Sequence, residues 1–246
     1  MQLTIDACVG QHQGDRNEQQ DRVAIFQHPQ ADNVLMAVVA DGMGGHAGGA
    51  RAAEQVLVTA RNYFDSYRPD SEPVHDMMEQ CIMEAHFLIN TMRIINEQDP
   101  RSTSVSLVLD GKSAYWAHCG DSRLYRFYGR NLIRRTQDHS YVEALIRKGK
   151  ITLDEATDHP KRNMLLTSIG GEDNPTISLD RSMRLRPGDN YLLCSDGLWA
   201  YFTNDELGTV LSVMSARDAC ASLIERARER SDGKGDNISL AILKLL

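Results

Sequence analysis

Four aspartates occupy similar places along the chain, each next to a glycine and at the edge of an apolar run. Asp41 and Asp196 come at the end of apolar runs and precede a glycine. Asp121 and Asp236 each follow a glycine, and Asp236 comes just before another apolar run. Small neighbours leave room for a ligand to approach closely. Carboxylate oxygens suit Mg²⁺ or Mn²⁺, and two such ions close together can generate a hydroxide and neutralise a phosphoryl group.

The competing interpretation of these aspartates is purely conformational. Taken alone, any one Asp-Gly pair is more typical of a tight turn than of a metal site. Four carboxylates together, all beside runs that predict core strands, favour convergence at sheet edges. The pattern therefore predicts a carboxylate cage for a hard cation.

Four short motifs resemble, in the family's order, the successive signature motifs of PP2C-type protein phosphatases. They are Asp41-Gly42-Met43-Gly44-Gly45-His46, Gly120-Asp121-Ser122-Arg123, Ser195-Asp196-Gly197-Leu198 and Gly235-Asp236-Asn237. Each motif is weak alone, but their order and spacing are specific, and the resemblance spans nearly the whole chain. It implies a bacterial metal-dependent phosphatase that hydrolyses phosphoserine and phosphothreonine on proteins.

The resemblance also assigns roles to individual residues. It implies that Asp41 bridges two metal ions and that the carbonyl of Gly42 binds one of them. Asp196 and Asp236 are expected to complete the shell of the other ion, and Asp121 to serve a third, weaker position. The implied cofactors are two or three Mn²⁺ or Mg²⁺ ions.

Two further residues near the N-terminus take roles from the family. Arg16 falls where relatives have a phosphate-binding arginine, whose fork matches a phosphate group. Asp21 falls where they have an acidic residue that reaches metal-bound water. The implied mechanism is direct attack of a metal-bridging hydroxide on phosphorus, with Arg16 and the metals stabilising the equatorial oxygens and no phosphoenzyme.

The sequence departs from the family pattern in several places. Gln19-Gln20 stand where relatives often carry Asn-Glu, and Arg101-Ser102-Thr103 where many carry Gly-Thr-Thr. Met43 stands where the eukaryotic branch has a histidine proposed as general acid. His46 is the nearest substitute, because a histidine that titrates near neutral pH could protonate the leaving oxygen. The alternative role for His46 is to orient the glycine loop or a water.

Two of these motifs also resemble motifs of other enzyme classes. Residues 42–47 also satisfy the GxGxxG/A dinucleotide fingerprint, but the expected ribose-binding acid falls near Asp65, inside a predicted helix. Gly120-Asp121-Ser122 resembles a GDS-type esterase motif, yet no histidine follows an aspartate by three residues. The second-ranked function is a catalytically weak phosphoprotein-binding regulatory module of the same fold. Four costly carboxylates kept close together argue against it.

Periodicity predicts the elements that must position these residues. Alternating or apolar runs predict strands at Leu3–Val9, Val23–Phe26, Val34–Ala40, Val105–Leu109, Ala114–His118, Leu124–Phe127, Ile177–Leu185, Tyr191–Cys194 and Ile238–Leu243. Three- and four-residue spacing predicts helices over Ala50–Tyr67 and Val74–Ile95. Capping patterns predict helix starts at Thr152, Thr203 and Ser215, the last helix running to about Arg230.

Strands in blocks with long helices between the blocks favour an α+β layered fold over a doubly wound parallel sheet. Together with the resemblance, we expect two packed, mainly antiparallel β-sheets flanked by helices, an α-β-β-α sandwich, with a small flap subdomain over about 140–162. The length suits one phosphatase domain over 1–246. In the flap, Arg147, Lys148 and Lys150 are expected to contact an acidic phosphopeptide.

Composition limits the remaining possibilities. The net charge of −7, without a basic stripe, argues against a nucleic-acid partner. Five scattered cysteines without a CxxC pair fit a reducing cytosol. With no signal peptide or membrane-spanning run, we expect a cytoplasmic protein with no membrane partner, monomeric by default. The expected partners are phosphorylated proteins, including a Ser/Thr kinase or its targets, and His118 and His139 are assigned structural roles.

Overall fold

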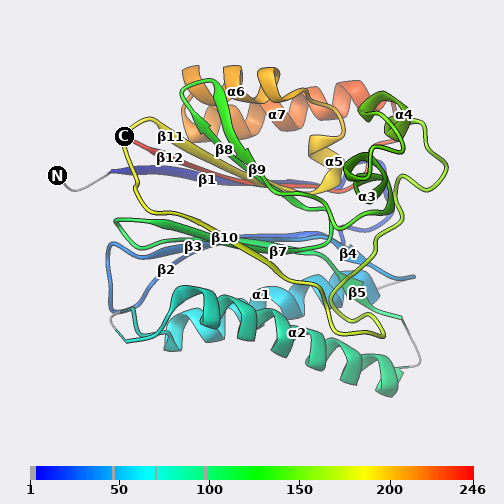
Figure 1. Ribbon diagram of the computed structural model, residues 1–246, viewed down its shortest axis with the longest axis horizontal. Helices are drawn as coiled ribbons and strands as arrows, with labels where there is room; N and C mark the ends of the chain where they lie inside the picture. The colour runs from blue at the N-terminus through cyan, green and yellow to red at the C-terminus, as the bar shows by residue number, and fades with distance from the viewer. Residues whose placement is uncertain (1–3, 46–47, 70, 97–98) are drawn as a thin grey trace.

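Two five-stranded β-sheets lie face to face between layers of helices (Figure 1). The computed structural model describes residues 4–45, 48–69, 71–96 and 99–246. One sheet has the order β1 (Ile5–His12), β12 (Ile238–Leu245), β11 (Asp189–Cys194), β8 (Arg123–Tyr128) and β9 (Asn131–Arg135). The other has the order β10 (Ser178–Ser182), β7 (Ala114–Cys119), β6 (Ser104–Leu109), β3 (Leu35–Ala40) and β2 (Arg22–Gln27). Neighbouring strands in both sheets are antiparallel.

Long helices cover the outer face of each sheet. The helices α1 (Gly48–Ser66) and α2 (Val74–Asn96) lie on the sheet that contains β3, and α6 (Asn204–Val213) and α7 (Ala216–Ser231) lie on the sheet that contains β12 (Figure 1). The expected α-β-β-α sandwich is therefore confirmed. No helix in the described part of the chain combines the length and apolar character needed to cross a membrane.

Alternation along the strands builds the core in three layers. In β3, Ala37 and Val39 pack between the two sheets, whereas Met36 and Val38 pack toward α1 and α2. The inner strands are buried on both faces, so they appear in the sequence as continuous apolar runs. β12 follows the same rule, with Leu243 between the sheets and its even-numbered neighbours toward α7.

The predicted flap contains two short helices between β9 and β10. They are α3 (Tyr141–Arg147), capped by the Ser140 hydroxyl, and α4 (Leu153–Thr157), which begins with the predicted Thr152 capping box. The flap closes on itself, because Tyr141 N donates to Met164 O at 2.8 Å and Leu166 N donates to His139 O at 2.8 Å. These two hydrogen bonds join the start of the flap, at residues 139–141, to its end, at residues 164–166.

Most predicted elements form, with shifted ends. The predicted strand Ile177–Leu185 is too long, because only Ser178–Ser182 pairs with β7. The short pair β4 (Gly42–Met43) and β5 (Arg101–Ser102) and the edge strand β9 were not predicted. β4 and β5 are too short to show a period, and β9 is a mostly exposed strand with two terminal arginines. The helix α5 (Asp196–Trp199) is a single turn and was also not predicted.

Candidate active site

Loops at one end of the two sheets bring together the predicted site residues. Asp41 lies between β3 and β4, and Asp121 lies in the turn from β7 to β8. Asp196 begins α5, and Asp236 lies two residues before β12. Figure 1 shows β4 and α5 at this same end of the sandwich. Both sheets therefore contribute carboxylates to one region, as the strand-edge pattern predicted.

These residues open onto a cavity of about 650 Å³. Its lining includes Arg16, Asp41, Gly42, Asp121, Asp196 and Asp236, together with Asn163 and Leu165 from the end of the flap. The predicted site residues that the structure describes thus share one space, except Asp21. The Asp21 side chain is 1 % exposed and lies behind the cavity wall, where the Ser195 hydroxyl donates to its Oδ2 at 2.7 Å.

Burial and mutual repulsion make the carboxylate cluster costly in its ionised form. Burial is the largest cause, and it raises the pKa of Asp21 and of Asp121 to about 8 and that of Asp196 to about 6. Burial, followed by the charges of Asp21 and Asp196, raises the pKa of Asp41 well above its usual value. The negative charge of Asp236 raises the pKa of Asp196 further. Such a cluster favours either protons or cations among its oxygens.

The positively charged guanidinium of Arg16 contacts the cluster directly. Its Nη2 donates to Asp236 Oδ2 at 2.5 Å, and this hydrogen bond is the largest cause that raises the pKa of Arg16. Within the described residues, no three His, Cys, Asp or Glu side chains form a ready-made metal cluster. The donor set nevertheless fits a hard divalent cation, because it consists of carboxylate and backbone oxygens with an excess of negative charge.

The backbone of Asp41 is held by the segment that departs from the family pattern. Thr103 N donates to Asp41 O at 2.8 Å, and Asp41 N donates to Thr103 Oγ1 at 3.0 Å. The Ser102 hydroxyl also donates to Asp41 O, at 3.1 Å. The departure at Arg101-Ser102-Thr103 therefore leaves a well-bonded loop beside the cluster.

Gly42 lies where no side chain fits. A Cβ at this position would come within 2.1 Å of Gly49 O and 2.6 Å of Gln20 O. The close approach lets the start of α1 pack directly against β4. The glycine that follows Asp41 is thus required by packing, whatever its carbonyl binds.

A family model described as protein phosphatase 2C matches residues 10–234. The chain belongs to the protein phosphatase 2C family. As a member of that family it is a protein phosphatase. The matched residues include Asp41, Asp121 and Asp196, and Asp236 lies two residues after their end.

Named relatives agree with this family. The serine/threonine phosphatase stp of Listeria welshimeri is 29 % identical over 93 % of this chain and 91 % of its own length. The structure of the serine/threonine phosphatase Stp1 from Staphylococcus aureus is 27 % identical, with a TM-score of 0.89 over 100 % of this chain and 98 % of that one. The catalytic domain of the serine/threonine protein phosphatase PstP, solved with two manganese ions, shares the fold at 24 % identity and a TM-score of 0.83, over 99 % of each chain.

The predicted histidines have different outcomes in this phosphatase. His46 lies outside the described residues. His118 and His139 stack with their ring centroids 4.5 Å apart, and neither lines the large cavity. His118 Nε2 contacts Gln137 O at 2.8 Å and His139 Nε2 contacts Ser178 Oγ at 2.9 Å. These contacts fit the structural role that was predicted for both residues.

Sequence reasoning missed the polar residues that support the cluster. Asn237 and Ser195 were quoted in the motifs only as neighbours of aspartates, yet both are buried and hydrogen-bonded to loops of the site. Their position in the sequence could have indicated this role, since each is the direct neighbour of a candidate metal ligand. Trp199 was missed entirely, although its Nε1 donates to Asp121 O at 3.0 Å.

Proposed function

We propose that this phosphatase hydrolyses phosphoserine and phosphothreonine on proteins at the 650 Å³ cavity, with Asp41, Gly42, Asp121, Asp196 and Asp236 as metal ligands. The chain is a metal-dependent serine/threonine protein phosphatase of the PP2C family. The observation that carries the site assignment is the convergence of four carboxylates from both sheets on one cavity beside Arg16. The binding-module alternative is not favoured, because the relatives are named as phosphatases.

The metal ions would be held by oxygen atoms alone. We propose two or three Mn²⁺ or Mg²⁺ ions, and the PstP structure with two manganese ions supports the lower number. When bound, such ions supply a hydroxide nucleophile and neutralise the phosphoryl charge. We propose that Asp41 would hold both ions and that the Gly42 carbonyl would hold one of them. Asp21 is buried behind the wall, so we propose that it reaches the ions only through a water.

The protein's own residues then bind and orient the phosphoryl group. Arg16 lines the cavity, and its guanidinium would donate to two phosphate oxygens if Asp236, its present ion-pair partner, held a metal ion instead. Asn163 and Leu165 also line the cavity, and we propose that they limit the direction from which a peptide approaches. No described histidine lines the cavity, so His46 remains the proposed general acid.

The biological setting is proposed on the same basis. Phosphorylated proteins are the substrates, and we propose that they include a Ser/Thr kinase or its targets in the cytoplasm. We further propose that residues 1–246 act as one phosphatase domain and as a monomer.

Phosphate release from a phosphothreonine peptide tests the proposal. The wild type should release phosphate in Mn²⁺ and lose this activity in EDTA, and Asp41→Asn should be inactive in Mn²⁺. Asp205→Asn is a matched control, because Asp205 is exposed in the first turn of α6. Release that survives EDTA would overturn the metal mechanism. Peptide binding without release in Mn²⁺ would favour the binding module.

A further inference from the structure

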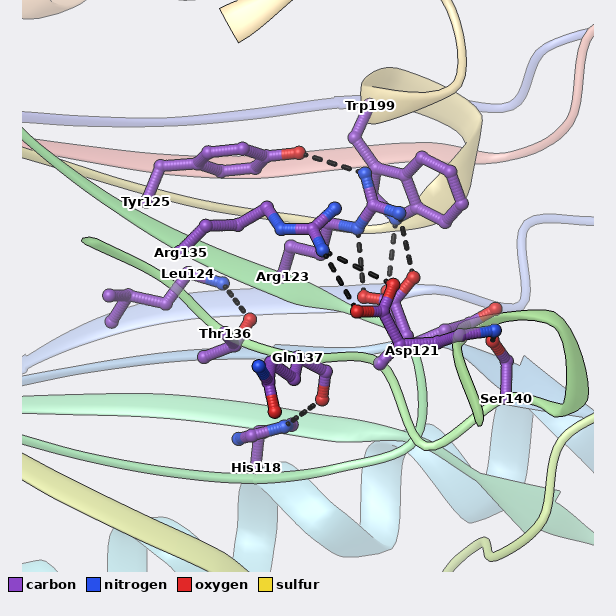
Figure 2. A network of polar contacts seen from close by, with 12 residues as sticks. His118, Asp121, Arg123, Leu124, Tyr125, Arg135, Thr136, Gln137, Ser140 and Trp199 are labelled. Atoms are coloured by element: carbon purple, nitrogen blue, oxygen red, sulfur yellow. Dashed lines mark hydrogen bonds and ion pairs between the residues drawn. The ribbon is translucent and has the colours of Figure 1, made fainter. Parts of the chain in front are cut away.

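The Arg123 guanidinium is the centre of a buried polar network beside the cavity (Figure 2). It forms a bidentate ion pair with Asp138, at 2.8 Å from Nε and 2.7 Å from Nη2. Its Nη1 donates to the Tyr125 hydroxyl at 3.1 Å. Its Cζ lies 3.4 Å from the centroid of the Trp199 ring, so the guanidinium stacks on the indole. One side chain therefore connects its own strand β8 with α5 and with the loop between β9 and α3.

Trp199 connects two of the carboxylate-bearing segments. It lies in α5, the single turn that begins with Asp196. Its Nε1 donates to the backbone carbonyl of Asp121 at 3.0 Å. A four-residue helix cannot fix its own orientation, so its position depends on contacts of this kind. The indole thus sets the distance between the Asp196 helix and the Asp121 turn.

Asp138 connects the same network to the base of the flap. The segment that contains it runs beside the Asp121 turn, because His139 N donates to Gly120 O at 2.9 Å. Two residues later the chain enters α3 through the Ser140 cap. The Asp138 side chain is 5 % exposed, and Arg123 is its only ion-pair partner among the described residues. Arg123 therefore neutralises the buried charge of Asp138 in the loop that leads from β9 to the flap.

We propose that Arg123 is a positioning residue for metal binding, which holds Asp121 and Asp196 at their working separation through Trp199 and Asp138. It lies behind both carboxylates and does not line the cavity, so it does not act on the substrate directly. Residues behind metal ligands commonly control affinity by fixing ligand orientation. This inference rests on the proposed function, since the separation of the two carboxylates matters only if they bind metal.

The same strand offers a matched control. Arg126 forms a second buried bidentate ion pair on β8, with Asp189 at 3.0 Å. Asp189 begins β11, at the end opposite to Asp196. A lysine at either position keeps the positive charge but loses the planar fork. Loss of stability alone should therefore affect the two lysine variants alike.

Calorimetric titration of the metal-free protein with Mn²⁺ tests the proposal. The variants are Arg123→Lys, Trp199→Phe and Arg126→Lys, each shown to be folded by circular dichroism. Trp199→Phe keeps an aromatic ring under the guanidinium but removes the donor to Asp121 O. Arg123→Lys and Trp199→Phe should weaken Mn²⁺ binding roughly 10-fold, whereas Arg126→Lys should bind as the wild type does despite a lower melting temperature.

The outcomes separate this inference from the function that underlies it. Wild-type affinity in both Arg123→Lys and Trp199→Phe would overturn the positioning role and leave the phosphatase site intact. An equal loss in Arg126→Lys would also overturn it, because the effect would then follow from stability. A wild type that binds no Mn²⁺ would overturn the proposed metal site and, with it, this inference.

Discussion

The side chain of Asn237 holds the loop between β1 and β2 beside the carboxylate cluster. Its Oδ1 accepts from Gln20 N at 2.7 Å, and its Nδ2 donates to Gln13 O and Glu18 O at 2.7 and 2.9 Å. The loop that these contacts hold carries Arg16. One amide therefore determines where the proposed phosphate-binding guanidinium lies relative to Asp236.

Replacing Asn237 with alanine should affect both stability and substrate binding. The change removes three half-buried hydrogen bonds, one from Gln20 N and two to Gln13 O and Glu18 O, which should cost about 1 to 3 kcal/mol of unfolding free energy. A loosened Arg16 loop should also raise the KM for a phosphothreonine peptide. Chemical denaturation and steady-state kinetics in Mn²⁺ measure the two effects.

Asn190 provides the comparison for that experiment. It is also buried, and its Nδ2 donates to Gly129 O and Gly188 O, far from the cavity. Asn190→Ala should lose stability while the KM stays unchanged. A KM that rises equally in both variants would mean that Asn237 has no special connection to the Arg16 loop.

Residue types and spacing were enough to predict the ligand candidates but not their supports. Asp41, Asp121 and Asp196 have a detectable signal, because a charged residue at the end of an apolar strand is costly unless it is used. Asn237 and Trp199 have no such signal, since a polar or aromatic residue beside a strand is ordinary. Their roles depend on which segments the fold brings together, and this is a property of the tertiary structure.

At the scale of elements, the flap borders the cavity and carries exposed positive charge. Asn163 and Leu165 at its end line the large cavity. Arg147, Lys148 and Lys150, at and after the end of α3, are exposed. In a protein of net charge −7, such a local cluster of positive charge can attract an acidic peptide.

Changing Arg147, Lys148 and Lys150 together to glutamine should raise the KM for an acidic phosphopeptide severalfold. The Mn²⁺ dependence and the rate with the small substrate para-nitrophenyl phosphate should stay unchanged, because these residues are remote from the carboxylates. The matched control is the triple change of Lys112, Arg217 and Arg226, which are exposed elsewhere. An unchanged KM in the flap variant would refute the recognition role.

The sequence predicted the helices whose starting residues carry a capping pattern. It did not predict the strand β9, which forms only by pairing with β8. The capping boxes at Thr152 and Thr203 satisfy free amides within four residues, so the sequence alone contains the information. β9 forms because Phe127 and Tyr128 present an edge to Leu132 and Asn131. Nothing within Asn131–Arg135 indicates that edge.

At the scale of the whole molecule, the sandwich places ionisable groups where their charged forms are disfavoured. Folding raises the pKa of Asp21 and of Asp121 to about 8, chiefly by burial, from a usual value of 3.8. The native state therefore binds more protons than the unfolded state up to about pH 8. Burial lowers the pKa of His139 to about 4 and also lowers that of His118, and this has the opposite effect below pH 6.5. From pH 6.5 to 8 the histidine contribution fades as the unfolded histidines lose their remaining protons, so the carboxyl contribution dominates this interval.

The metal-free protein should lose stability as the pH rises from 6.5 to 8. A group with a raised pKa stabilises the folded state fully below its unfolded pKa and loses that contribution as the pH rises through its folded pKa. For one such carboxyl the loss over this interval is on the order of 1 to 2 kcal/mol, which lowers the melting temperature by a few degrees. Calorimetric melting in EDTA at several pH values measures it.

Saturating Mg²⁺ should reduce or reverse this trend, because metal binding requires ionised carboxylates and strengthens as they lose protons. Asp21→Asn removes one of the raised groups, so its metal-free melting temperature should fall less steeply over the same interval. Asp205→Asn, exposed on α6, should keep the wild-type slope. A metal-free wild type whose melting temperature is level from pH 6.5 to 8 would show that the cluster is better solvated than its burial indicates. The case for a cation as its natural counterion would then rest on geometry alone.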